Sequence, residues 1–309
     1  MNEMEQPITI QKIKEILPVQ NKFLMLDGAL KKSETEYLGW KSLTMNEHFF
    51  QGHFPNHPIL PGVLEIEMAS QLAEIAVQDK LDPSRTHDIY LKKLEQVKFR
   101  RPNVPGDRIM IRQNQLELTD TEAVFSSVLE NASGVACQMK LTLAVRDRVM
   151  QTNIPEPFDE YDRNHALPKL DVVGIMNLIP HRYPFLFLDY VIKHEERKIV
   201  AVKNLSSDEI FYRTYPDGYM VIGNSIQSEI ISQPGAIHIL TTEAYKDKIV
   251  YFMGIEKAEF HEPLFPGDRL VLDVDIPPFM RSFGKSTGRL MVRGKIVSTI
   301  SMLFAIVDP

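Results

Sequence analysis

The feature that most constrains this chain is a long internal repeat. Three pairs of similar segments keep an almost constant offset of 161–162 residues: 17–27 with 179–189, 67–71 with 229–233, and 99–108 with 260–269. Repeats of solenoid and propeller proteins are only about 20–50 residues long, so a repeat of this length is a whole domain. The chain is therefore predicted to contain two copies of one domain, which arose by duplication.

The two copies are predicted to occupy residues 1–148 and 170–309, joined by a linker over residues 149–169. The linker loses the regular apolar spacing and collects prolines and acidic residues. Within the first copy, the spacing predicts a short helix, two strands, one long helix and then several long strands, over residues 8–17, 23–31, 36–44, 62–80 and 87–146. This order is typical of an α+β domain in which an antiparallel sheet covers one main helix.

Residues 47–71 combine a histidine, a run of prolines and a carboxylate in an apolar helix. Three prolines follow His53, and they exclude a regular helix or central strand there, so a stiff loop should hold this histidine in place. Gly62 then begins the long helix, whose free N–H groups can bind an oxyanion. Glu67 lies among the apolar residues of that helix. A histidine, a helix N-terminus and a carboxylate are the parts of an acid–base site.

The second copy differs from the first where this chemistry is expected. At the offset of 162 residues, His53 is replaced by Tyr215, whereas Glu67 is matched by Glu229. The chain thus carries one such histidine and two such carboxylates. A phenol with a pKa near 10 is a poor base at neutral pH, so we expect a packing role for Tyr215.

Composition is ordinary for a globular protein and argues against several other classes. The formal net charge of −6 gives no indication of a nucleic-acid partner, and the one cysteine, Cys137, cannot form an internal disulfide and fits a reducing compartment. The sequence shows no long apolar run and no leader pattern, so a cytoplasmic protein is expected. No Cys/His cluster has metal-ligand spacing and no glycine-rich phosphate loop occurs, so no metal or cofactor is expected.

Residues 53–71, HFPNHPILPGVLEIEMASQ, resemble the signature of the bacterial 3-hydroxyacyl-[acyl-carrier-protein] dehydratases of the hotdog-fold superfamily. The resemblance lies in His-Phe-Pro, two further prolines, Gly-Val, and a glutamate fourteen residues after the histidine. Residues 179–189 resemble the N-terminal segment of the family, and residues 97–107 resemble its strand and turn. The resemblance implies a double hotdog, in which each half is a long helix wrapped by an antiparallel sheet and the halves pair as a pseudo-dimer.

The resemblance also implies where the site lies, because the family builds its active sites across the dimer interface. His53 is then the base and faces Glu229, which acts as an acid or orients the substrate. Glu67 faces Tyr215 in a degenerate second site. The N–H of Gly62 is the implied oxyanion donor, and that of Ile59 is a weaker candidate. To act as an acid, Glu229 needs a pKa raised by an apolar pocket.

The implied reaction is the dehydration of 3-hydroxyacyl thioesters on acyl carrier protein to trans-2-enoyl thioesters, in fatty acid biosynthesis or a specialised lipid or polyketide-like pathway. The basic residues Lys98, Arg100 and Arg101 either form a solvated strand face or dock the acidic carrier protein. The alternatives are hydration of an enoyl-CoA, thioester cleavage, added double-bond isomerisation, or a non-catalytic acyl-binding module. The chain is expected as a monomeric pseudo-dimer or a trimer of pseudo-dimers.

Overall fold

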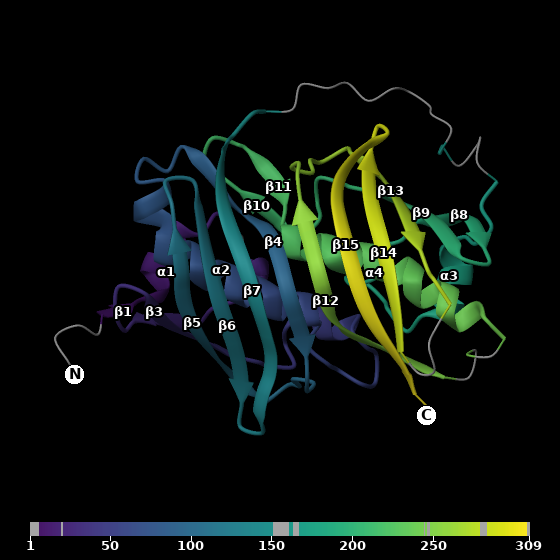
Figure 1. Cartoon of the computed structure of the whole chain (residues 1–309), viewed down its shortest axis with the longest axis horizontal. Coiled ribbons are helices and arrows are strands. Elements are labelled where there is room, and N and C mark those ends of the chain that lie inside the picture. The colour runs from purple at the N-terminus through teal and green to yellow at the C-terminus, as the bar shows by residue number, and fades with distance from the viewer. Residues whose placement is uncertain are drawn as a thin grey trace.

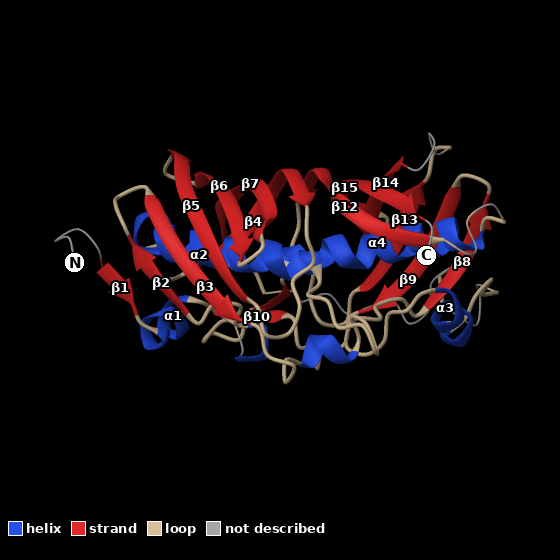
Figure 2. Cartoon of the chain, turned by 90° about the horizontal axis from the view of Figure 1, so that it is seen from below, coloured by secondary structure: helices blue, strands red, loops and turns tan. Residues whose placement is uncertain are grey.

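Two similar units lie end to end in the computed structural model of this chain, and each folds its part of a sheet around one long helix (Figures 1 and 2). The structure describes residues 6–19, 21–150, 161–162, 167–243, 245, 248–278 and 283–307. The hydrophobic core is continuous through both units. The predicted α+β double hotdog is confirmed.

The first unit follows the predicted order of elements. Its helices and strands are β1 (Gln6–Ile8), α1 (Ile10–Ile16), β2 (Gly28–Lys31), β3 (Glu36–Ser42), α2 (Gly62–Leu81), β4 (His87–Phe99), β5 (Arg108–Leu118), β6 (Glu122–Asn131) and β7 (Gly134–Asp147). The strand predicted over residues 23–31 was too long, because Asn21–Phe23 form a 3₁₀ turn and the strand begins only at Gly28. A second 3₁₀ turn, His48–Gln51, leads into the histidine loop.

The second unit repeats this arrangement. Its elements are α3 (Val172–Leu178), β8 (Tyr190–Glu195), β9 (Lys198–Asn204), β10 (Tyr212–Thr214), β11 (Met220–Ile222), α4 (Asn224–Thr241), β12 (Ile249–Phe260), β13 (Arg269–Asp275), β14 (Phe283–Val292) and β15 (Lys295–Val307). Strands β10 and β11 form a small separate hairpin. This hairpin stands where the first unit has its histidine loop, so the two copies diverge in backbone as well as in sequence.

One sheet joins the two units through the antiparallel pair β4 and β12 at the centre of the molecule (Figure 1). Gly254 of β12 lies opposite Lys98 in this pair. A Cβ atom at Gly254 would lie 2.1 Å from the carbonyl oxygen of Val97, so the close approach of the strands requires a glycine here. The halves therefore pair edge to edge, as two subunits of a hotdog dimer would.

Helices α2 and α4 lie along one line inside the curved sheet (Figure 2), and their N-terminal turns meet where the two units join. Helix α2 is buried along most of its length, including three carboxylates. Each of these has a polar partner: Glu65 accepts from Asn103, Glu67 from Ser225 and Glu74 from Arg213. Buried carboxylates require such partners, because desolvation of an unpaired charge is costly.

The predicted linker over residues 149–169 falls largely outside the described residues, so the domain bounds remain a prediction. Among the helices that the structure describes, none combines the length and the apolar character that crossing a membrane requires.

Candidate active site

The loop before α2 fixes His53 in the neutral tautomer that can act as a base. The Nδ1 atom of His53 lies 2.8 Å from the carbonyl oxygen of Ile59, which can only accept a hydrogen bond. Nδ1 therefore carries the proton, and Nε2 keeps a free lone pair. The N–H of Ile59 donates in return to the carbonyl oxygen of His53 at 3.0 Å, which closes the loop on itself. Burial lowers the pKa of His53 to about 4, although Glu229 opposes this shift, so the imidazole is neutral at neutral pH.

The opposing carboxylate comes from the other half of the chain. Glu229 lies on α4 and is only 5% exposed. Gln233, one helical turn later, donates from Nε2 to Oε1 of Glu229 at 3.2 Å and also to the carbonyl oxygen of Phe185 at 2.7 Å. The N–H of Phe187 donates to Oε1 of the Gln233 amide at 3.1 Å. The carboxylate is thus fixed in orientation by a residue that is itself fully hydrogen-bonded.

The structure brings together His53, Glu229 and a third residue, His181, which the sequence did not single out. One ring nitrogen or carboxylate oxygen from each of the three lies within 4.8 Å of the others. The geometry therefore agrees with the expected meeting of His53 with Glu229 across the two halves. These three atoms could also offer ligands to a divalent cation. Metal binding and acid–base chemistry would use the same lone pairs, and we interpret the trio as an acid–base group.

His181 precedes β8 and contacts both other members of the trio. Its Nε2 atom lies 3.3 Å from Oε1 of Glu229, and its side chain is 12% exposed. The imidazole rings of His181 and His53 meet edge to face, with centroids 5.5 Å apart. The sequence did contain a signal for this residue: at the offset of 162 residues, the first copy has Val19 at the same place. Because this histidine occurs only in the copy that supplies Glu229, the difference between the copies could have identified His181 as a candidate site residue.

The segment that carries His181 is tied directly to the histidine loop. The backbone N–H of Arg182 donates to the carbonyl oxygen of Gly52 at 3.0 Å. The Arg182 guanidinium donates to the carbonyl oxygens of Ile179 and Met176, at 2.9 Å each, which fixes the turn after α3. A Cβ atom at Gly52 would lie 2.1 Å from the carbonyl oxygen of Arg182, so only glycine permits this contact.

The expectation that an apolar pocket raises the pKa of Glu229 is wrong. Burial does raise it, but the hydrogen bond and charge of His181, with smaller contributions from His53 and Gln233, outweigh burial and lower the pKa below its ordinary value. The apolar neighbours foreseen from the sequence are present, and Ile226 and Ile230 are fully buried. The sequence could not show that a second histidine would be folded against the same carboxylate.

The two backbone groups considered for the oxyanion differ in the structure. Gly62 is the first residue of α2, so its N–H has no partner within the helix. The N–H of Ile59 already donates to His53, which leaves Gly62 as the stronger candidate. A Cβ atom at Gly62 would lie 2.7 Å from the ring of Phe99. The glycine is therefore required by the packing of Phe99, a reason that the sequence did not supply.

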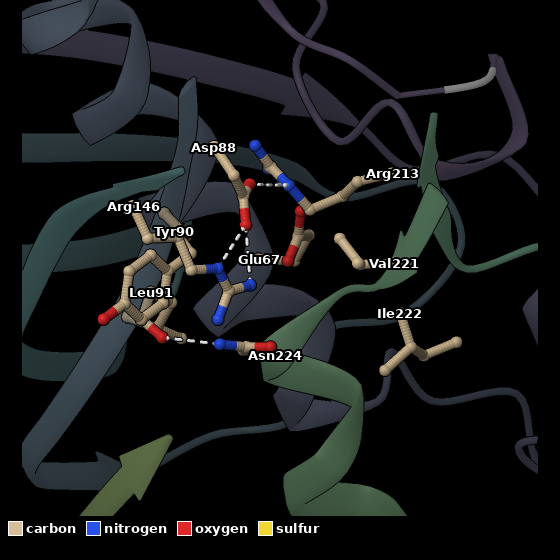
Figure 3. A pocket seen from close by; sticks show the side chains of 10 residues that line it. Glu67, Asp88, Tyr90, Leu91, Arg146, Arg213, Val221, Ile222 and Asn224 are labelled. Carbon is tan, nitrogen blue, oxygen red and sulfur yellow. Dashed lines mark hydrogen bonds and ion pairs between the residues drawn. The ribbon is translucent and has the colours of Figure 1, made fainter. Parts of the chain in front are cut away.

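The region expected to form the degenerate second site is a pocket lined in part by an ion-pair network (Figure 3). The Arg213 guanidinium donates to both carboxylate oxygens of Glu74, at 2.9 and 2.8 Å. The hydroxyl of Tyr215 donates a hydrogen bond to Asp88 at 2.6 Å, and the Arg146 guanidinium forms an ion pair with Asp88 at 2.6 Å. Tyr215 was expected to face Glu67, but its hydroxyl bonds with Asp88 and Arg213 instead.

Glu67 is occupied by neutral partners within this network. Ser225 Oγ donates to Oε2 of Glu67 at 2.6 Å, and Gln71 donates to Oε1 at 2.9 Å. Asn224, which stands at the position equivalent to Gly62, donates a hydrogen bond from Nδ2 to the carbonyl oxygen of Leu91 at 2.8 Å. Polar and charged side chains thus line the region that corresponds to the site of His53 and Glu229, and no histidine contacts Glu67 among the residues that the structure describes.

The basic residues noted in the sequence, Lys98, Arg100 and Arg101, are all exposed. They flank Phe99, whose ring covers Gly62, so they lie beside the site. Arg100 donates to the side-chain oxygen of Gln138. Lys92 and Lys93, earlier on β4, form ion pairs with Glu122 and Glu95. Between described residues, no ion pair neutralises Lys98, Arg100 or Arg101.

Comparisons with known proteins agree with this architecture. A family described as ApeI dehydratase matches residues 30–139, and a FabA-like domain matches residues 179–301. The 3-hydroxyacyl-[acyl-carrier-protein] dehydratase FabZ of Desulforamulus reducens is 36% identical over 138 residues, which are 44% of this chain and 97% of that protein. The corresponding enzyme of Staphylococcus carnosus is 37% identical over 139 residues, or 45% of this chain and 96% of that protein. The chain belongs to the hotdog-fold dehydratase family.

Solved structures match both halves together. The dehydratase domain from the CurJ module of curacin polyketide synthase superposes with a TM-score of 0.63 at 13% identity, covering 96% of this chain and 98% of that domain. The dehydratase domain of RzxB from Pseudomonas fluorescens gives a TM-score of 0.60 at 10% identity, covering 92% and 99%. The double-hotdog fold is thus shared with these domains.

Proposed function

We propose that this protein is a hydro-lyase that dehydrates 3-hydroxyacyl thioesters on acyl carrier protein to trans-2-enoyl thioesters. The observation that carries the proposal is the composite site, in which a neutral imidazole from one half meets a buried carboxylate from the other half. The relatives named as 3-hydroxyacyl-[acyl-carrier-protein] dehydratases support the substrate class. We place the reaction in fatty acid or related lipid biosynthesis.

His53 is the base in this proposal. Its Nε2 lone pair takes a proton from C2 of the substrate, whose acidity derives from the adjacent thioester carbonyl. The backbone N–H of Gly62 at the start of α2 would donate to the oxygen of that carbonyl as negative charge develops. Loss of one such donor typically costs about 3 kcal/mol of transition-state stabilisation. Glu229 binds the 3-hydroxyl group that departs.

The exposed basic residues Lys98, Arg100 and Arg101 form a docking surface for the acidic carrier protein in this proposal. They flank Phe99, so a carrier bound there would deliver its thioester beside Gly62. Charge complementarity of this kind mainly raises the rate of association. The chain supplies one working site in this proposal, because the equivalent pocket is lined by the ion-paired Arg213 and Asp88 and has no histidine among its described lining residues.

The test compares the two carboxylates by the same substitution. We expect His53→Ala and Glu229→Gln each to lower kcat/KM for dehydration by about 10²–10⁴-fold, because each removes a proton-transfer or substrate-binding group from the site. Glu67→Gln is the matched control in the degenerate site and should stay within about threefold of the unmodified protein. Absorbance of the conjugated enoyl thioester measures the reaction, with carrier-protein and CoA substrates in parallel.

The opposite pattern, an inactive Glu67→Gln variant beside an active Glu229→Gln variant, would show that the assignment across the halves is wrong. Release of a free thiol without enoyl absorbance would identify thioester cleavage instead. Binding of acyl thioesters with no turnover would identify a non-catalytic acyl-binding module.

A further inference from the structure

His181 is present only where a working site is assembled. Its Nε2 atom lies 3.3 Å from Glu229, and its ring packs edge to face against Phe54 as well as His53. At the equivalent place in the first half, Val19 pairs through its backbone with Arg213 and offers no polar side chain. The carboxylate of that half, Glu67, receives a serine hydroxyl instead. Among the residues that the structure describes, the site with Glu229 therefore holds two histidines and the site with Glu67 holds none.

The surroundings of Glu229 contain few groups that could control its charge. The titratable groups that face it are His181, from the segment before β8, and His53, from the loop before α2. Its own helix contributes the neutral amide of Gln233. The nearby Arg182 guanidinium is engaged with backbone carbonyl oxygens, His181's own among them. His181 is thus the strongest charge-stabilising partner of this carboxylate.

We propose that His181 is a positioning residue that keeps Glu229 ionised and oriented, so that Glu229 accepts a hydrogen bond from the substrate hydroxyl while His53 both removes and returns the proton. This inference rests on the dehydration proposed above and deepens it. A carboxylate that must protonate the leaving hydroxyl has to hold a proton at rest. A carboxylate that receives the N–H of an adjacent imidazole is held in the ionised state instead.

The reaction balances without any proton from Glu229. The C2–H bond breaks, its proton goes to Nε2 of His53, and the electron pair moves onto the thioester oxygen. That pair then returns to form the C2=C3 double bond as the C3–O bond breaks. The departing oxygen takes the proton from Nε2 of His53 and leaves as water. The enzyme ends in its starting protonation state.

The electrostatics of His53 suit both of its roles. Burial lowers its pKa to about 4, so the imidazole is unprotonated and available as a base at neutral pH. Once it has taken a proton, the same burial makes the imidazolium a strong acid toward the leaving oxygen. The lowered pKa of Glu229 fits an orienting carboxylate and opposes the role of a proton donor.

The experiment is the pH dependence of kcat/KM in His181→Val and His181→Gln variants, with Val19→Ala as the matched control in the other half. The unmodified protein should show a level profile between about pH 6 and 9, since its carboxylate is already ionised there. In His181→Val, burial of Glu229 is no longer opposed by the histidine. The apparent pKa of the acidic limb of the kcat/KM profile should then rise by at least one pH unit, and the plateau value of kcat/KM should fall at least tenfold. His181→Gln, whose amide can still donate to Glu229, should recover most of the plateau.

Two kinetic outcomes would overturn the inference. One is an alkaline limb between pH 5 and 8 in the unmodified protein that moves upward in His181→Val, which would mean that Glu229 must be protonated for activity. The other is a His181→Val variant whose activity falls with no change in the shape of its pH profile and no recovery in His181→Gln, which would indicate a purely structural role.

A measurement without turnover separates this inference from the proposed function. Infrared difference spectra against Glu229→Gln report whether Glu229 is a carboxylate or a carboxylic acid at each pH. We expect a carboxylate at pH 6 in the unmodified protein and a carboxylic acid in His181→Val. If that result appears without any dehydration, the proposed function fails and the role of His181 stands. If Glu229 titrates identically in both proteins, the role of His181 fails whatever the activity.

Discussion

One backbone contact prepares His53 for the role of base that we propose for it. The carbonyl oxygen of Ile59 fixes the tautomer, and the return bond from the N–H of Ile59 fixes the loop. The prolines around this pair make the loop stiff, which is what the sequence indicated. The sequence could not show that Ile59 orients the histidine, because both bonds use backbone atoms that every residue possesses.

Glu65 gives a prediction at the residue scale that is independent of catalysis. Burial raises the pKa of Glu65 to about 7, and its hydrogen bonds with Asn103 and Cys137 oppose this only in part. A carboxyl whose pKa is raised on folding stabilises the native state fully below about pH 4.5, and this contribution is lost as pH rises through 7. The shift corresponds to about 3 kcal/mol of unfolding free energy.

The variant Glu65→Gln should therefore lose this part of the pH dependence, because a glutamine amide does not titrate but can still accept from Asn103. Urea unfolding at a series of pH values from 5 to 8 measures the difference. A free energy of unfolding that falls equally steeply in both proteins would show that Glu65 is not the buried titrating group.

At the scale of elements, the working site depends on the contact between the histidine loop and the segment before β8. Gly52 and Arg182 form this contact through backbone atoms only. We expect Gly52→Ala to separate the two segments, since the added Cβ would collide with the carbonyl oxygen of Arg182. The distance between His53 and His181 should increase, and kcat/KM should fall by about tenfold or more, in line with the sensitivity of catalysis to small misplacements.

Thermal unfolding and kcat/KM are measured for both the Gly52→Ala variant and the unmodified protein. A Gly52→Ala protein with unchanged kcat/KM and an unchanged Tm would mean that the backbone adjusts easily and that the contact does not position the site.

At the scale of the whole molecule, buried ion pairs join the two halves at the second site. We predict that Arg213→Ala lowers the free energy of unfolding by about 3–5 kcal/mol, because it leaves Glu74 and Asp88 buried without this partner. Its kcat/KM should stay close to that of the unmodified protein, since Arg213 lies in the other site. Denaturant unfolding and the dehydration assay measure the two effects.

Arg112→Ala is the matched control, because the side chain of Arg112 is 61% exposed and its ion pair with Glu130 lies at the surface. Such pairs contribute only about 0–1 kcal/mol. If Arg213→Ala proves as stable as this control, the network does not support the fold. A loss of activity without a loss of stability would show that Arg213, and with it the second site, takes part in the reaction.

The sequence by itself determined the duplication, the α+β class, the stiff loop with His53 and the survival of a carboxylate in each copy. These follow from periodicity, proline geometry and side-chain identity, which are local properties of the chain. The resemblance added the expectation that His53 meets Glu229. The 3₁₀ turn before β2 was missed and the strand was predicted too long, because apolar residues in a tight turn have the same spacing as those in a strand end.

Only the tertiary structure decided which groups share an electrostatic environment. His181 and Glu229 are far apart in the sequence. Burial has the largest single influence on the pKa of Glu229 and raises it, but the 3.3 Å contact with His181, together with His53 and Gln233, lowers this pKa below its ordinary value. Arg213 likewise meets Glu74 and Asp88 only because the hairpin of the second half folds over the first. Charges act through space over distances of a few ångströms, and folding alone sets those distances.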